Sequence, residues 1–189
     1  DVPVVHIEAG LRSFDRTMPE EINRVLTDQI SEILFTTERD ARENLRREGI
    51  ADSRIHFVGN VMIDSLLSHL DRAVPFNRTI EAHGEEGIPE GTSYGVVTLH
   101  RPSNVDEPEQ LRALMAVLGR VGECLPLVFP VHPRTAARLE GIGFDCPPGL
   151  RLTGPVGYLE MLGLMKDAKL VLTDSGGMQE ETTAHGVPC

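Results

Sequence analysis

The sequence predicts an α/β protein with parallel sheets, because apolar strand-like runs alternate with amphipathic helix-like stretches along most of the chain. Two such series are separated by residues 71–93, which include Pro75 and Pro89 and show no sustained periodicity. The 189 residues, 40% apolar and 25% charged, suffice for one large domain or two modest ones. We therefore expect an α/β domain in residues 1–75, a linker at residues 76–93 and a second α/β domain in residues 94–189.

The first series alternates three strands with three helices. Apolar side chains in residues 20–34 are spaced so that they form one stripe along a helix. Residues 37–48 form a charged helix with a solvated face, with Thr37 as N-cap and Gly49 as stop signal. In order, the expected elements are a buried strand at 2–7, a helix from 20, a strand at about 33–36, the helix at 37–48, a strand at 55–58 and a helix from 61 to about 70.

The second series contains four strands and four helices. The strands are expected at 94–99, 127–131, 150–152 and 170–173, and the helices at 107–124, 134–140, 158–167 and 177–185. In parallel α/β folds, ligands bind at the carboxyl ends of the strands. Functional residues are therefore expected immediately after the strands.

The bulk composition narrows the class of partner. A formal net charge of −11 argues against nucleic acid and membrane partners, because the chain as a whole repels anionic surfaces. Any site for an anionic ligand must then be locally basic or rich in backbone N–H groups. The cysteines show neither a C-x-x-C spacing nor an even-numbered framework, and the sequence contains no transmembrane run and no signal peptide. These features predict reduced thiols in a cytoplasmic protein.

A carboxylate and a guanidinium follow the first strand, in the segment from His6 to Ser13. Gly10 allows a tight turn there, so Glu8 is placed to act as a base or to stabilise positive charge in a transition state. An equally good interpretation is that Glu8 and Arg12 simply pair with each other on a loop.

The next polar segment resembles a helix start. Thr17 with Glu20 three residues later is a capping box, and Pro19 suits the first helical turn. Because Glu20 and Glu21 are adjacent, one can cap the helix while the other faces a cleft.

The second series places histidine and arginine after two of its strands. His100 is suited to proton transfer near neutral pH, and Arg101 can clamp a pyrophosphate with two hydrogen bonds. His132 and Arg134 repeat the arrangement one βα unit later. Histidines of this kind can also be purely structural, and that alternative stays open.

The last strand runs through Ser175-Gly176-Gly177 directly into a helix. Glycines let the backbone approach a phosphate, and the free N–H groups and dipole of the helix attract it. Glu180 or Glu181, one turn further, could accept hydrogen bonds from ribose hydroxyls. The alternative is an ordinary turn that needs glycine for a positive φ. Together, the strand ends indicate a nucleotide or phosphorylated ligand bound between two α/β domains.

Five motifs in this order, HIEAGLRS, MPEEINR, TLHRPSNVD, PVHPR and LTDSGGMQEE, resemble the non-hydrolysing UDP-N-acetylglucosamine 2-epimerases. The resemblance runs through nearly the whole chain and is weakest at residues 71–93. It implies the GT-B architecture of two Rossmann-like domains, both incomplete in this chain, in a homodimeric enzyme. The implied reaction interconverts UDP-N-acetylglucosamine (UDP-GlcNAc) and UDP-N-acetylmannosamine (UDP-ManNAc) by eliminating UDP to 2-acetamidoglucal and adding it back.

The resemblance also implies roles for particular residues. Glu8 and Glu20 match the catalytic carboxylates, and His100 matches a histidine near the pyrophosphate that helps UDP to leave. The implied UDP-binding residues are Arg101, His132, Pro155 and Tyr158 near the uracil or phosphates, Ser175, Gly176 and Gly177 at the diphosphate, and Glu181 at the ribose. Arg12 and Glu21 are implied at a regulatory site for a second UDP-GlcNAc, an allosteric activator. No metal and no cofactor are expected.

The chain departs from the family pattern at both ends. The family begins with a βα unit bearing a Gly-Thr-Arg-Pro-Glu turn, then an aspartate-bearing loop, and it continues beyond the motif that precedes Cys189. We therefore expect a fragment that is inactive and poorly folded in isolation. Three rival functions stay open: a GT-B glycosyltransferase, the hydrolysing UDP-GlcNAc 2-epimerase and a non-catalytic nucleotide-sugar sensor.

Overall fold

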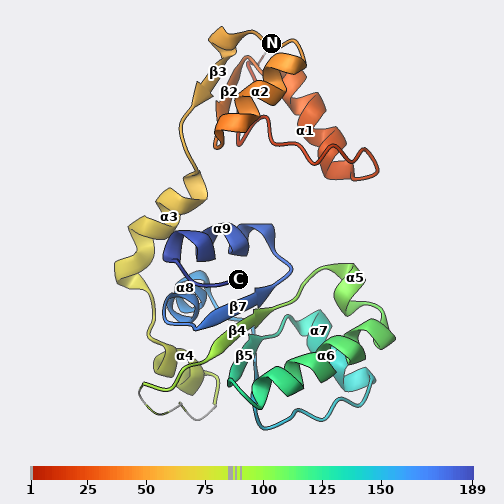
Figure 1. Cartoon of the computed structure of the whole chain (residues 1–189), viewed down its shortest axis with the longest axis vertical. Helices are drawn as coiled ribbons and strands as arrows, with labels where there is room; N and C mark the ends of the chain where they lie inside the picture. Colours follow the sequence, from red (N-terminus) through yellow and green to blue (C-terminus); the bar gives the residue numbers. More distant parts are fainter. Residues whose placement is uncertain (1, 85–86, 88, 90) are drawn as a thin grey trace. The chain divides into compact units, whose positions relative to one another are not determined.

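The computed structural model describes residues 2–84, 87, 89 and 91–189, and it contains two compact α/β units. The first unit is Asp1–Asp64 and the second is Ser65–Cys189. Both sheets contain only parallel pairings among the described residues, as the alternation of strands and helices predicts (Figure 1). No helix within the described ranges combines the length and the apolar character needed to cross a membrane.

The first unit has a three-stranded sheet in the order β1-β2-β3. Its elements are β1 (Val5–Ile7), α1 (Pro19–Ile30), β2 (Ile33–Thr36), α2 (Arg39–Arg47), a 3₁₀ turn (Asp52–Arg54) and β3 (Ile55–Phe57). The register pairs Val5 with Ile33 and Leu34 with Ile55. A small core joins the sheet to α2, and it consists of Ala9, Leu34, Leu45, Ile50 and Ile55.

One expectation for the first unit is wrong. The first strand is not buried, because β1 is an edge strand of the sheet and Val5 and Ile7 are 46% and 56% exposed. The expected helix forms, and its apolar stripe faces outward: Leu26 is 60% exposed, whereas Asp28 on the opposite side of the helix is fully buried. This side of the helix faces inward because Asp28 accepts hydrogen bonds from Gly10 and Arg12, which belong to the loop after β1.

The second unit has a four-stranded sheet in the order β6-β5-β4-β7. It is preceded by α3 (Val61–His69), which crosses the boundary between the units, and a 3₁₀ turn (Leu70–Arg72). The remaining elements are α4 (Phe76–Ala82), β4 (Gly95–Thr98), α5 (Pro102–Val105), α6 (Pro108–Gly122), β5 (Leu127–Pro130), α7 (Pro133–Gly141), β6 (Leu150–Thr153), α8 (Tyr158–Lys166), β7 (Leu170–Thr173) and α9 (Gly176–His185).

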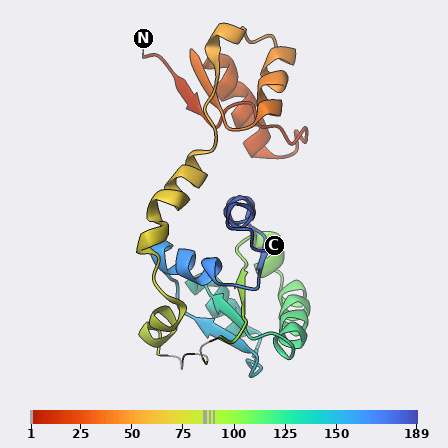
Figure 2. The same cartoon turned by 60° about the vertical axis from the view of Figure 1, so that its left-hand side comes forward.

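Helices cover both faces of this second sheet (Figure 2). On one face, α4 and α8 pack against Val96, Val128 and Val171. On the other face, α6 and α7 pack against Val97, Leu127 and Phe129. Consecutive residues of β4 thus enter opposite cores, as expected for a strand buried on both sides. The carboxyl ends of the strands remain as the place where loops can form a site.

The structure adds two helices that periodicity does not predict. Helix α4 lies inside the stretch expected to be a linker, and its Phe76 and Ile80 are buried against α8 and Tyr94. Seven residues are too few to show a helical period, which explains the omission. Helix α5 has only four residues. Residues 85, 86, 88 and 90 of the same stretch lie outside the described residues.

Two helix starts also differ from expectation. The N-cap of α1 is Met18 and makes no side-chain cap, because Thr17 donates its hydroxyl to Asp15 instead. The capping box of Thr17 and Glu20 is therefore absent, although Pro19 does occupy the first turn. The N-cap of α2 is Glu38 rather than Thr37, which is a shift of one residue.

Candidate functional site

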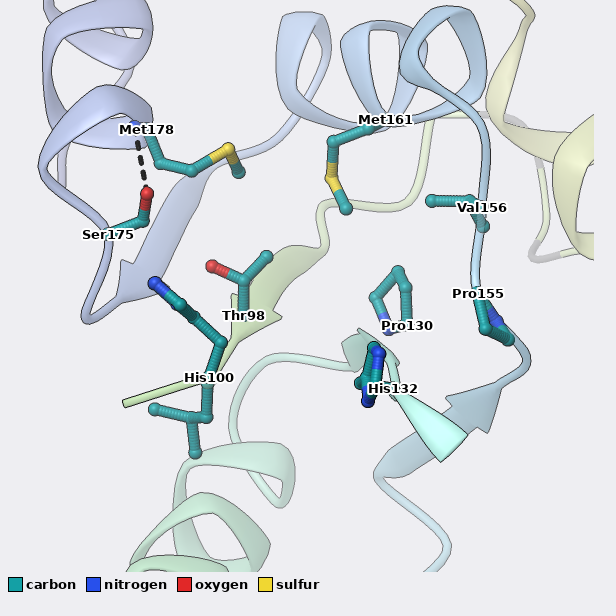
Figure 3. Close-up of a pocket in the computed structure, with 10 residues that line it drawn as sticks. Thr98, His100, Pro130, His132, Pro155, Val156, Met161, Ser175 and Met178 are labelled. Carbon is teal, nitrogen blue, oxygen red and sulfur yellow. Dashed lines mark hydrogen bonds between the residues drawn. The ribbon is translucent and has the colours of Figure 1, made fainter. Parts of the chain in front are cut away.

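The loops after β4, β5, β6 and β7 and the first turns of α8 and α9 line a cavity of about 340 Å³ that is open to solvent (Figure 3). This volume falls at the small end of the range for small-molecule sites. The lining residues are Thr98, Leu99, His100, Pro130, His132, Pro155, Val156, Met161, Ser175 and Met178. Four candidates named from the sequence, His100, His132, Pro155 and Ser175, are thus brought together from four separate loops.

Asp174 ties two of these loops together. Strands β4 and β7 are neighbours in the sheet, so His100 and Asp174 follow adjacent strand ends. One carboxylate oxygen of Asp174 lies 2.6 Å from His100 Nδ1, and the backbone N–H groups of His100 and Arg101 both donate to the carboxylate. Asn104 adds a 2.9 Å hydrogen bond from α5.

The surroundings of Asp174 favour its ionised form. Burial alone would raise the pKa of Asp174, but the hydrogen bonds from Asn104 and from the two backbone amides outweigh it and lower the pKa below its usual value. Sequence reasoning missed this residue. The signal was an acidic residue directly after a strand, but only the strand order shows that this strand adjoins β4.

The two histidines of the cavity use Nδ1 in opposite ways. His132 is the N-cap of α7, and its Nδ1 accepts a hydrogen bond from the backbone N–H of Arg134. His100 Nδ1 faces a carboxylate, which can only accept. A neutral His132 therefore carries its proton on Nε2, whereas a neutral His100 carries it on Nδ1. The cavity thus combines one Nε2–H donor with one Nε2 acceptor.

Arg101 belongs to the same loop and is exposed. Its Nε donates to the backbone carbonyl of Asp174 at 2.7 Å. Its two terminal nitrogens make no hydrogen bond to any residue that the structure describes. Because a guanidinium offers five donors, most of its capacity remains for a ligand.

The glycine turn before α9 is open. Ser175 is the N-cap, with its Oγ accepting from Met178 N, and Gly176 begins the helix. Neither Gly176 nor Gly177 has a positive φ, so the interpretation that the turn needs glycine for its backbone conformation is wrong. A Cβ added at Gly176 would meet no atom within 4 Å. The fold itself therefore does not require glycine at position 176.

Tyr158 begins α8 and Glu181 lies in α9, and neither of them lines the cavity. Burial raises the pKa of Glu181 above its ordinary value. Burial, followed by the charge of Glu181, likewise raises the pKa of Tyr158. The electrostatic influence of Glu181 on Tyr158 means that two residues 23 positions apart face the same region.

The first unit holds the other candidates. Glu8 is exposed and has a φ of 73°, a left-handed conformation that non-glycine residues rarely adopt. The next residues fix this conformation: Ala9 N donates to Phe35 O, and Gly10 N donates to Asp28. Such strain persists where the surroundings impose it, and it is often found at functional sites. Glu20 is exposed in the first turn of α1.

Arg12 and Glu21 are used inside the first unit. Arg12 does not pair with Glu8; it binds Asp28 and Glu48, each at 2.6 Å, and its side chain is 1% exposed. The hydrogen bond with Glu48 outweighs burial and, with Asp28, raises the pKa of Arg12. Glu48 is therefore not part of a purely solvated face.

Glu21 joins the loop after β1 to the first turn of α1. Its carboxylate accepts hydrogen bonds from the backbone N–H groups of Ser13 and Phe14, at 2.9 and 3.0 Å. Burial would raise the pKa of Glu21, but these two hydrogen bonds lower it overall. The segments that carry Glu8 and Glu20 are consequently in contact.

Among the residues that the structure describes, no cluster of three histidine, cysteine or acidic side chains could hold a metal ion. The glycine turn, the helix N-terminus and the adjacent arginine and histidines lie at the carboxyl ends of parallel strands, where α/β proteins bind their ligands. A family model described as UDP-N-acetylglucosamine 2-epimerase matches residues 1–189, and the chain belongs to this family.

Several relatives are similar over the whole chain. A UDP-N-acetylglucosamine 2-epimerase of Methanocaldococcus jannaschii is 44% identical over 100% of this chain and 52% of its own length. A UDP-2,3-diacetamido-2,3-dideoxy-D-glucuronate 2-epimerase of Pseudomonas aeruginosa is 43% identical over 100% of this chain and 51% of its own. The chain therefore spans about half the length of these relatives.

Solved structures of UDP-GlcNAc 2-epimerases also match this chain. The M. jannaschii UDP-GlcNAc 2-epimerase in complex with UDP-GlcNAc and UDP matches with a TM-score of 0.81 and 42% identity, over 99% of this chain and 52% of that one. The UDP-GlcNAc 2-epimerase from Neisseria meningitidis bound to UDP-GlcNAc matches with a TM-score of 0.83 and 29% identity, over 98% and 52%. The α/β fold with parallel sheets, expected as GT-B, is thus confirmed as that of part of a GT-B epimerase.

Proposed function

We propose that the protein interconverts UDP-GlcNAc and UDP-ManNAc as a non-hydrolysing 2-epimerase. The observation that carries the proposal is the open Ser175-Gly176-Gly177 turn beside His100, in a chain whose whole length matches the epimerase family. This arrangement suits a diphosphate bound to a helix N-terminus, next to a group able to move a proton.

The chemistry requires carboxylates. The C2 proton of the sugar is not adjacent to a carbonyl and is weakly acidic. Breaking the C1–O bond to UDP builds positive charge at C1, and this charge acidifies C2. Removal of the C2 proton completes the elimination to 2-acetamidoglucal and UDP. Return of a proton to the opposite face of C2 and re-addition of UDP at C1 give the epimer.

Roles follow for the charged groups. We assign Glu8 and Glu20 as the carboxylates that exchange the C2 proton and stabilise charge at C1, and His100 as the group that assists departure of UDP. The strained backbone and exposure of Glu8 support this assignment.

The second unit is assigned to UDP. The N–H groups of Gly176 and Gly177 and the hydroxyl of Ser175 bind the diphosphate, with Arg101 and His132 supplying further donors. Glu181 accepts from the ribose hydroxyls. Pro155 and Tyr158 contact the uracil, a role supported by the position of Pro155 in the cavity wall.

Regulatory binding of a second UDP-GlcNAc by Arg12 and Glu21 stays a prediction. The contacts of both side chains favour a different role, which is to hold the loop that carries Glu8. We further propose a cytoplasmic homodimer, for which the exposed free thiols support a reducing compartment. We also retain the assignment of residues 1–75 and 94–189 to two Rossmann-like domains.

Incubation of the complete gene product with UDP-GlcNAc alone in deuterated water tests the function. We expect UDP-ManNAc with deuterium at C2 and no accumulation of UDP. Accumulation of free N-acetylmannosamine and UDP would identify a hydrolysing enzyme. Unchanged UDP-GlcNAc without deuterium would contradict the proposal, and it would favour a glycosyltransferase or a sensor.

A second substrate has specific support. The Pseudomonas relative, a UDP-2,3-diacetamido-2,3-dideoxy-D-glucuronate 2-epimerase, is as similar to this chain as the archaeal UDP-GlcNAc epimerases are. The same C2 inversion applies to both sugars. Comparison of kcat/KM for the two nucleotide sugars decides between them, and we expect the higher value for UDP-GlcNAc.

A further inference from the structure

We propose that Asp174 is a positioning residue, which holds His100 in one tautomer and orientation so that Nε2 faces the ligand. The proposal rests on the proposed function and adds to it a residue that acts through the histidine. It assigns a chemical role to the aspartate of the LTDSGG motif, between the strand and the diphosphate turn.

The first line of support is the geometry of the carboxylate. Asp174 Oδ1 lies 2.6 Å from His100 Nδ1, and the side chain of Asp174 is only 7% exposed. The same carboxylate accepts the backbone N–H groups of His100 and Arg101, so the histidine is held by both its ring and its backbone. A ring bound through Nδ1 in this way can present only Nε2 to other partners.

The second line of support is the contrast in exposure. The side chain of His100 is 61% exposed, although its partner carboxylate is nearly buried. The ring lines the cavity and extends toward the turn at Ser175 (Figure 3). A histidine that merely completed the fold would be buried with its partner. Here one nitrogen is fixed and the rest of the ring is available.

The third line of support is electrostatic. A carboxylate next to a diphosphate site would repel the ligand if its charge were uncompensated. Asp174 accepts from two backbone amides, from Asn104 and from the His100 ring, and the Arg101 guanidinium lies against its backbone carbonyl. With its charge spread over these donors, the aspartate can control the histidine without repelling the phosphate.

The contact with Asp174 determines which nitrogen of His100 can exchange a proton with the ligand. With Nδ1–H bound to the carboxylate, protonation of His100 places the second proton on Nε2, in the cavity. This proton can be donated to the oxygen of UDP when the C1–O bond breaks, and it can be taken back when UDP adds again. The opposite tautomer would leave the lone pair of Nδ1 facing a carboxylate that cannot donate, and it would point a fixed N–H at the ligand in every state.

Asp174→Asn tests the proposal, because it preserves shape but replaces one acceptor oxygen with a donor. In the complete gene product we expect kcat with UDP-GlcNAc to fall by about 100-fold, within the range for loss of a positioned acid or base, and KM to change by less than about threefold. At a pH where the ring is neutral, ¹⁵N correlation spectra of His100 should show Nδ1–H in the wild type and a shift toward Nε2–H in the variant.

Two further variants separate positioning from simple folding. Asn104→Ala removes a different hydrogen bond to the same carboxylate and should leave the His100 tautomer unchanged. In a His100→Ala background, Asp174→Asn should cause little additional loss, since residues that act as a unit are not additive. Equal losses in both backgrounds would overturn the proposal.

The spectra also keep the proposal separate from the proposed function. A wild-type His100 with Nδ1 unprotonated in its neutral form would overturn the positioning role whatever the activity. If His100→Ala itself retained normal turnover, the role of His100 in the reaction would fail as well. Should the spectra match expectation while UDP-GlcNAc is not turned over, only the proposed function would be wrong.

Discussion

The regions around β1 and β4 both combine a histidine, an arginine and an aspartate, but the combination has a different role in each. Each region places a histidine and an arginine beside one aspartate: His6 of β1 and Arg12 of the following loop with Asp28 in the first unit, and His100 and Arg101 with Asp174 in the second. In both, the aspartate also accepts backbone N–H groups from the loop.

The two regions differ in how many hydrogen bonds the arginine makes within the fold and in how far the basic side chains are exposed. The guanidinium of Arg12 binds two carboxylates and a backbone carbonyl, and its side chain is 1% exposed. Arg101 gives one bond to a carbonyl, and the His100 side chain is 61% exposed. The same pattern is therefore architectural in the first unit, where it fixes the loop of Glu8, and available to a ligand in the second. Exposure and the supply of partners decide between the two roles, and residue type does not.

The largest expected effect follows from the loop of the first unit. Glu8→Gln should lower kcat by about 1,000-fold, because the amide cannot exchange the C2 proton. Glu8→Gly should be equally inactive but more stable than Glu8→Gln by about 1 kcal/mol, since glycine adopts a positive φ without strain. Turnover and urea unfolding measure both effects. A glycine variant less stable than the glutamine variant would contradict the idea that the loop imposes strain on Glu8.

The next largest effect compares the two arginines. Arg12→Met should destabilise the protein by about 3 kcal/mol, because it leaves the buried Asp28 carboxylate without its guanidinium. Arg101→Met, the matched change at the exposed arginine, should alter stability by less than about 0.5 kcal/mol and should weaken UDP binding instead. Denaturant unfolding and calorimetric titration with UDP provide the two readouts. Similar losses of stability in both variants would break the comparison.

A smaller effect is expected at the glycine turn. Gly176→Ala should weaken UDP binding by about tenfold, since the added methyl occupies the approach of the phosphate, which is worth about 1.4 kcal/mol. Folding should be unaffected because the Cβ meets open space. Gly163→Ala is the control, as its Cβ would collide with the backbone carbonyl of Val74 and should destabilise the protein. Retained UDP affinity in Gly176→Ala would remove the turn from the site.

The smallest expected effect is a pH dependence. Burial raises the pKa of Glu181, so this carboxylate becomes protonated at a higher pH than an exposed one. Ribose hydroxyls donate to the ionised form, and UDP affinity should therefore fall by a few-fold as pH decreases through the raised pKa. Glu181→Gln should bind UDP more weakly and lose that part of the pH dependence, while titration of the phosphate itself is common to both proteins.

Much of the fold could be predicted because the second series consists of strands buried on both faces and helices of ordinary length. Strands at Gly95–Thr98 and Leu170–Thr173 stand out as continuous apolar runs. Helix α4 was not predicted, because its burial depends on Tyr94 and α8, which are distant in the sequence. The stripe of α1 could be predicted, but its direction could not, because Asp28 is buried by hydrogen-bond partners in the loop after β1.

The residues of the candidate site could likewise be predicted only in part. His100, His132 and Ser175 follow strands and could be named from position alone. Asp174 could not, because its role depends on β7 lying next to β4, a non-consecutive pairing that the order of elements does not reveal. The contacts of Arg12 could not be predicted either, because its partners Asp28 and Glu48 lie 16 and 36 residues further along the chain.

We propose that Glu8 exchanges the C2 proton of UDP-GlcNAc and that this step is separate from the binding of UDP. The most direct measurement is exchange of the C2 hydrogen of UDP-GlcNAc with deuterated water by Glu8→Gln, together with its calorimetric affinity for UDP. The account predicts a wild-type affinity for UDP and a loss of exchange by about 1,000-fold. Exchange at the wild-type rate in this variant, or loss of UDP binding in step with exchange, would contradict it.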